Sequence, residues 1–98
     1  QMCIRDRQGR ATRLKQLQQR SRQENETQLF IETPYRNQAL LSDAVALLDN
    51  NTLLCIATDL TTPQQTIISQ PIKQWRKMGE LPNLKKRPTL FVIHSGNQ

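Results

Sequence analysis

Three apolar runs of strand length divide the chain, and none shows the alternation of a half-exposed strand. They are Leu29 to Ile31, Leu53 to Thr58 and Thr89 to His94. Because a continuous apolar run is typical of a strand covered on both faces, we expect all three inside an α/β sheet. A shorter and more polar run, Gln65 to Ser69, predicts an edge strand that pairs antiparallel with the strand before it.

Helical periodicity appears between these strands. Apolar residues recur at spacings of three and four from Gln38 to Asp49, which predicts a helix with a broad apolar face, and Asn37 is suited to cap it. From Arg10 to Asn25 the apolar stripe is thin, so we expect this helix to dock weakly. Pro71 is suited to the first position of a short helix that runs to Met78.

The order of these elements predicts the fold class α/β, with a small mixed β-sheet of about four strands and three helices. Since a helix separates the first two apolar strands, we expect them to be parallel neighbours in a β-α-β unit. The carboxyl ends of these two strands then lie at one rim, at Thr33 and Thr58. Ligands of open α/β sheets bind at such a rim.

The residues directly after the first strand are the main candidates for chemistry. Pro34 cannot donate to a sheet ladder, so the strand stops at Glu32 or Thr33. The Glu32 carboxylate either orients a substrate and accepts its proton, or it pairs with Arg36 or caps the next helix. Tyr35 is suited to stack on a base, and Arg36 to clamp a phosphate through two hydrogen bonds.

Charge and cysteine content limit the possible partners. The formal net charge of +6 comes largely from residues 5–22 and 73–87, which either bind a polyanion such as RNA or form solvated faces. The two cysteines make no metal pattern, and Cys55, inside an apolar run, is typical of a reducing compartment such as the cytoplasm. Because no apolar run is long enough to span a bilayer, we expect no membrane partner.

One resemblance covers the chain from Arg10 to His94. The run TQLFIETPYRN, an amphipathic helix, LLCIATDLT, a polar strand and RPTLFVIH follow one another in the order found in the C-terminal domain of the tetrapyrrole methylase superfamily. Within that superfamily the chain is most similar to the small-subunit ribosomal RNA cytidine 2′-O-methyltransferases, whose E-x-P-x-R element is matched by Glu32, Pro34 and Arg36. The chain departs from those enzymes at residues 59–62, DLTT, where they have E-L-T-K.

The resemblance implies a methyltransferase that uses S-adenosyl-L-methionine as its cofactor, with the C-terminal domain forming one wall of the cofactor and substrate cleft. It further implies a tentative catalytic role for Glu32 and substrate contacts by Tyr35 and Arg36. The cofactor-binding positions that it implies are Ile31, Glu32, Thr33, Ile56, Ala57, Pro88 and Thr89.

The resemblance also predicts domain organisation and partners. Residues 1–8 fall outside it and look like a non-native or disordered segment, 9–95 form the C-terminal subdomain, and 96–98 are a tail. The expected partners are ribosomal RNA or the small ribosomal subunit, the N-terminal domain of the same chain, and a second copy in a homodimer. We expect the 98 residues alone to be inactive. Two alternatives stay open, a non-catalytic basic RNA-binding module and a methylase of a tetrapyrrole-like small molecule.

Overall fold

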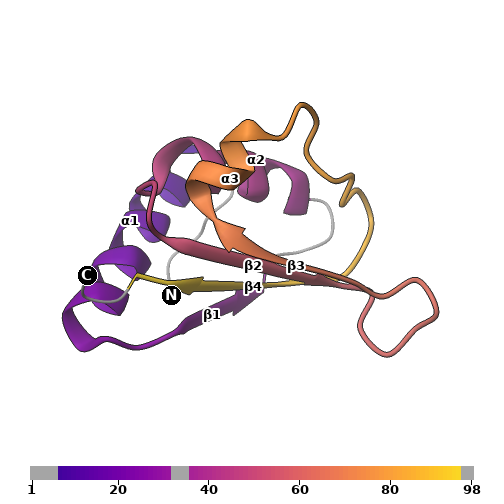
Figure 1. The fold of residues 1–98 in the computed structure, drawn as a ribbon, viewed down its shortest axis with the longest axis horizontal. Helices are drawn as coiled ribbons and strands as arrows, with labels where there is room; N and C mark the ends of the chain where they lie inside the picture. Colours follow the sequence, from indigo (N-terminus) through magenta and orange to yellow (C-terminus); the bar gives the residue numbers. More distant parts are fainter. Residues whose placement is uncertain (1–6, 32–35, 96–98) are drawn as a thin grey trace.

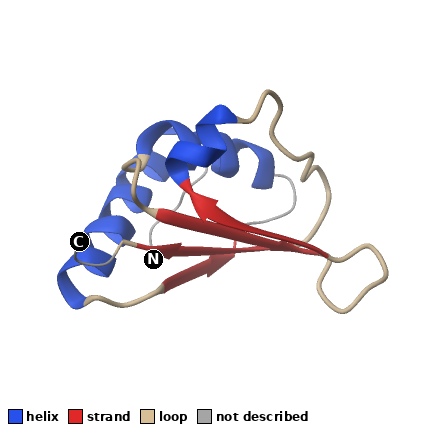
Figure 2. Cartoon of the chain, viewed as in Figure 1, coloured by secondary structure: helices blue, strands red, loops and turns tan. Residues whose placement is uncertain are grey.

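The protein is described by a computed structural model that covers residues 7–31 and 36–95. These residues form three helices and four strands, which confirms the small α/β domain expected from the sequence. In chain order the elements are α1 (Arg7–Glu24), β1 (Gln28–Ile31), α2 (Asn37–Leu47), β2 (Leu53–Thr58), β3 (Thr66–Pro71), α3 (Ile72–Lys77) and β4 (Thr89–His94) (Figures 1 and 2).

The four strands form one sheet in the order β1-β4-β2-β3, and every neighbouring pair is antiparallel. Strands β1 and β2 run in the same direction, because both are antiparallel to β4. The prediction that they are direct neighbours is wrong, since β4 lies between them. The unit β1-α2-β2 is therefore a split β-α-β unit whose gap is filled by the last strand. The β2-β3 hairpin is confirmed.

The helices cover one face of the sheet and leave the other face open (Figures 1 and 2). Alternate residues of the central strands point into the helical layer, where Leu54, Ile56 and Phe91 are fully buried. On the opposite face Leu29 is 61% exposed and Ile31 is 74% exposed. The prediction that both faces of β1 are covered is therefore wrong for its described residues. Leu29 and Ile31 belong to an open apolar face, whereas Phe30 between them packs against the core and stacks on Phe91.

Helix α1 is part of this domain. Leu14 is fully buried and Leu17 nearly so, both in the same core cluster as the residues of α2 and the sheet. A polar side chain joins them: Gln18, 5% exposed, accepts hydrogen bonds from the Asp49 N–H and from the Thr52 hydroxyl, both at 2.7 Å. Helix α1 thus packs on the core of this domain, and buried polar contacts widen the face that packs; the strength of this docking stays a prediction.

Helix α2 begins one residue earlier than predicted. Asn37 is its first helical residue and makes no cap hydrogen bond; instead, its amide donates to the carbonyl of Arg87. At the other end of α2 the Arg76 guanidinium, from α3, donates to the carbonyls of Val45 at 2.8 Å and Leu48 at 2.6 Å. These bonds satisfy carbonyls that the helix itself leaves unpaired. None of the three described helices has the length and apolar character needed to cross a membrane.

Candidate functional site

An apolar pocket of about 280 Å³ lies on the open face, at the rim where β1 and β2 end and β4 begins. The strand register creates it, because Ile31 pairs with Leu90, and Leu90 pairs with Ala57. The floor of the pocket is therefore a row of apolar side chains across three strands. Its lining residues are Ile31, Ala57, Asp59, Leu60, Thr62, Pro88, Thr89 and Leu90.

The structure brings together four of the residues that the resemblance implies for the cofactor, namely Ile31, Ala57, Pro88 and Thr89. Ile56 does not join them. It is fully buried under the helices on the other face of the sheet, because neighbouring residues of a strand point in opposite directions. Its assignment to the same cofactor surface does not fit this geometry.

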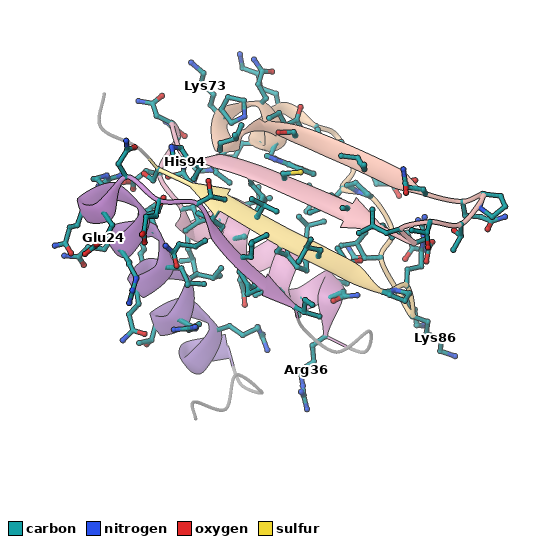
Figure 3. The ribbon with its side chains drawn as sticks, turned by 90° about the horizontal axis from the view of Figure 1, so that it is seen from below. Glu24, Arg36, Lys73, Lys86 and His94 are labelled. Carbon is teal, nitrogen blue, oxygen red and sulfur yellow. The ribbon has the colours of Figure 1, made fainter. Side chains whose placement is uncertain are left out.

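The remaining predicted site residues lie between β1 and α2, where the description stops at Ile31 and resumes at Arg36. Glu32, Thr33 and Tyr35 lie outside the described residues, so the catalytic and substrate roles suggested for them stay predictions. Arg36 is described, half-buried at the N-cap position of α2. In Figure 3, which looks onto the open face, Arg36 and Lys86 lie toward the pocket end of the sheet, and Glu24 and His94 lie toward the other end.

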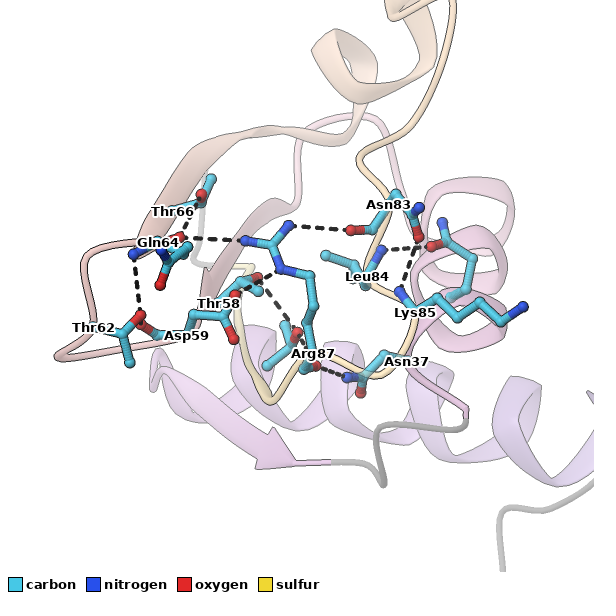
Figure 4. A network of polar contacts seen from close by, with 12 residues as sticks. Asn37, Thr58, Asp59, Thr62, Gln64, Thr66, Asn83, Leu84, Lys85 and Arg87 are labelled. Atoms are coloured by element: carbon cyan, nitrogen blue, oxygen red, sulfur yellow. Dashed lines mark hydrogen bonds and ion pairs between the residues drawn. The ribbon is translucent and has the colours of Figure 1, made fainter.

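A network of polar contacts, here called the rim network, holds the loops beside the pocket (Figure 4). Its centre is Arg87. The Nε atom of Arg87 donates to Oδ2 of Asp59 at 2.7 Å, and its two terminal nitrogens donate to the carbonyls of Asn83 at 3.2 Å and Gln64 at 3.3 Å. One guanidinium thus joins the loop after β2 to the loop before β4. In the basic run Lys85 to Arg87, Lys85 and Lys86 are exposed, whereas the Arg87 side chain is 34% exposed and is held by these contacts.

The β2-β3 loop is further fixed by its own side chains. The Thr62 hydroxyl donates to the carbonyl of Asp59 at 2.7 Å, and the Thr61 N–H donates to the Gln65 side chain at 2.9 Å. Asp59 and Thr61 have positive φ angles of 53° and 66°, which is uncommon for residues with a side chain. These bonds help to hold the tight turn that places Leu60 and Thr62 on the pocket wall.

A second set of contacts continues the rim network toward the helices. The Thr89 hydroxyl donates to the carbonyl of Arg87 at 3.0 Å and lies 3.4 Å from the Thr58 hydroxyl. The same carbonyl accepts from the Asn37 amide at the start of α2. The Oδ1 atom of Asn37 is buried without a hydrogen-bond partner among the described residues. The start of α2, the end of β2 and the start of β4 are therefore tied together around Thr89, which lines the pocket.

Sequence reasoning missed part of this site. It noted residues 59–62 as a departure from the family pattern but did not assign Asp59, Leu60 or Thr62 to the site, and it did not foresee Leu90 or the role of Arg87. Leu90 lies opposite Ala57 in the register of β4 and β2, so it could be assigned only once that register is known. The Asp59–Arg87 pair joins residues 28 positions apart and has no local signal. The described residues contain no cluster of histidine, cysteine and acidic side chains suited to a metal ion.

No protein-family model matches this chain, and a search among curated proteins found no match.

Proposed function

We propose that this chain is the C-terminal part of an S-adenosyl-L-methionine-dependent methyltransferase and that the pocket at the sheet rim is its share of the cofactor cleft. The observation that carries the proposal is the apolar pocket itself, lined by Ile31, Ala57, Pro88 and Thr89. These are positions that the family resemblance implies for the cofactor. The proposal is therefore supported by the agreement between the positions that the resemblance implies and the residues that line the pocket.

The pocket fits part of such a cofactor. Its floor is flat and apolar, because it is the surface of a sheet between Ile31, Leu90 and Ala57, and the small Ala57 side chain allows a ring to approach closely. Its volume of about 280 Å³ is at the low end for a complete ligand site. A second wall must therefore cover a bound cofactor, and in this proposal an N-terminal domain supplies it.

Methyl transfer asks these residues mainly to bind and orient. The bound cofactor supplies an already activated methyl group, so the protein must align the acceptor with it and keep water out. Ile31 and Leu90 supply an apolar surface that excludes water on one side. Proton removal from a hydroxyl acceptor is assigned to Glu32, as the resemblance implies.

The acceptor in this proposal is ribosomal RNA, and the site of action is the cytoplasm. Lys85 and Lys86 are exposed on the loop before β4, and Arg36 lies toward the same end of the sheet (Figure 3). Cations there are suited to the phosphates of an RNA strand. A tetrapyrrole-like acceptor remains the alternative. RNA binding that weakens steeply with salt supports the first, and binding that ignores salt contradicts it.

The cofactor assignment is tested by nuclear magnetic resonance on the chain labelled with nitrogen-15. Titration with S-adenosylhomocysteine, the demethylated product, should shift amide signals at Ile31, Ala57 and Leu90. The affinity should be weak, in the range of about 1 mM or about 4 kcal/mol of binding free energy, because only one wall is present. Tight binding measured by calorimetry contradicts the single-wall part of the proposal, and an absence of localised shifts contradicts the cofactor part.

A matched pair of variants makes this test specific. Ala57→Leu fills the pocket floor and should abolish the shifts, since the added side chain occupies the place of the ligand. Ala46→Leu makes the same chemical change at an exposed position of α2 and should leave the titration unchanged. Equal loss in both variants indicates a general effect on the fold and counts against the pocket as the binding site.

A further inference from the structure

The pocket has one ionisable side chain among its described lining residues, and that side chain is an acid. Asp59 stands in a wall whose other members are apolar or carry hydroxyl groups. Its side chain is only 18% exposed, so its charge is less screened by water than that of a surface carboxylate. A ligand in this pocket therefore meets a fixed negative charge at close range.

The contacts of Asp59 hold this charge in position. Arg87 donates to Oδ2 at 2.7 Å, and no described residue donates to the second carboxylate oxygen, Oδ1. The Asp59 backbone is fixed as well, since its N–H donates to the carbonyl of Pro88 at 3.0 Å and its carbonyl accepts from Thr62. Arg87 itself does not line the pocket. Asp59 is thus the charged residue that lines the pocket, and Arg87 binds only one of its two carboxylate oxygens.

We propose that Asp59, positioned by Arg87, is the specificity-determining residue of this pocket and selects a positively charged ligand over a neutral or anionic one. The inference deepens the proposed function, on which the identity of the natural ligand rests. For a methyltransferase it means that the sulfonium cofactor is held more tightly than its uncharged thioether product. Because the product has lost the positive charge, Asp59 no longer attracts it, and the product leaves the pocket more readily than the cofactor does.

This selectivity runs against the charge of the whole chain, which makes it diagnostic. The formal net charge is +6, and Lys86 is exposed on the neighbouring loop. If the overall field decided binding, anions would bind best. If the local charge of Asp59 decides binding, cations bind best although the chain as a whole is positively charged.

The test uses three ligands that share the adenosine framework and differ in charge at one position. These are 5′-amino-5′-deoxyadenosine, adenosine and adenosine 5′-monophosphate, each titrated into the nitrogen-15-labelled chain. The amine should bind about threefold to fivefold more tightly than adenosine, and the phosphate should bind most weakly, as befits one partly buried charge. In Asp59→Asn the affinities of the three ligands should differ by no more than about twofold.

Two further measurements keep the proposal falsifiable if Asp59→Asn does not fold. Raising the salt concentration should narrow the preference of the unmodified chain, because ions screen the carboxylate. Arg87→Met removes the donor that positions the Asp59 carboxylate and should narrow the preference for the amine toward that of Asp59→Asn. Equal affinity for the three ligands, tightest binding of the phosphate, or no shift at the pocket with any of them overturns the inference.

The outcomes separate this inference from the proposed function. If the amine preference depends on Asp59 but S-adenosylmethionine and its product cause no shifts, the charge selection stands and the methyltransferase proposal fails. If S-adenosylmethionine and its product bind equally well, and equally in Asp59→Asn, the cofactor site stands and the charge selection fails.

Discussion

Truncation of Leu14 tests directly whether α1 belongs to this domain. Its side chain is fully buried in the core cluster, and Leu14→Ala removes about three methylene equivalents, or about 2.4 kcal/mol of transfer free energy at about 0.8 kcal/mol each. The cavity left behind adds to this, so we expect a loss of about 3 kcal/mol, within the range of about 2 to 5 kcal/mol for such changes. A domain of this size is stable by only about 5 to 15 kcal/mol.

Urea unfolding followed by circular dichroism measures this loss. With a slope of about 2 kcal/mol per molar urea, the midpoint should fall by about 1.5 M. The neighbouring exposed residue provides the control, since Lys15→Ala should change the unfolding free energy by no more than about 0.5 kcal/mol. If Leu14→Ala also stays within about 0.5 kcal/mol of the unmodified chain, α1 does not pack on this core in solution and the reasoning is refuted.

Two further predictions concern the charged side chains around α2. Arg76→Met removes the guanidinium that donates to the last carbonyls of α2. Thermal unfolding should show that the free energy of unfolding falls by about 1 to 3 kcal/mol. The control Lys77→Met, at an exposed position, should lower it by less than about 0.5 kcal/mol. The hydrogen bond from Arg22 holds the pKa of Asp49 below its usual value of 3.8, so this contact stabilises the fold above that pH and its contribution disappears as the pH falls through the lowered folded-state pKa. Urea unfolding at pH 7 should therefore show that Asp49→Asn is less stable than the unmodified chain by under about 1 kcal/mol, because the Arg22 and Asp49 side chains are both 48% exposed. If this difference in unfolding free energy grew on acidification, the assignment would be contradicted.

Elements with a strong local pattern could be predicted from the sequence. The runs Leu53 to Thr58 and Thr89 to His94 become strands β2 and β4 with the predicted bounds. Turn or proline residues border both runs, so the limits are set locally. The shared rim of the ends of β1 and β2 followed from their common direction, and the start of β4 was added to it by the family resemblance, which is why part of the pocket could be predicted.

The arrangement of strands could not be predicted in the same way. Whether β4 adds at an edge or enters between β1 and β2 depends on contacts between residues more than 30 positions apart, for example Ala57 and Leu90. The open face was missed because Leu29 and Ile31 are apolar although exposed. Period-two reasoning assigns exposure only where polar residues occupy the outer positions.

Side-chain roles that depend on tertiary contacts could not be predicted from the sequence either. Asn37 has the chemistry of a helix cap, but in the fold its amide binds the carbonyl of Arg87. Arg87 follows two exposed lysines, and besides the carbonyl of Asn83 in its own loop it contacts Asp59 and Gln64 in the loop after β2. A local pattern cannot distinguish these uses from the ones that sequence reasoning expects.

The central place of β4 has a consequence for synthesis of the protein on the ribosome. The three earlier strands emerge first, but β1 has no neighbour in the sheet until β4 is made, because it pairs with β4 alone. Nascent chains that end before Thr89 should thus hold β2 and β3 as a hairpin while β1 waits unpaired, with its apolar side chains open to chaperones. Completion of the sheet becomes a late event, timed by the appearance of its last strand.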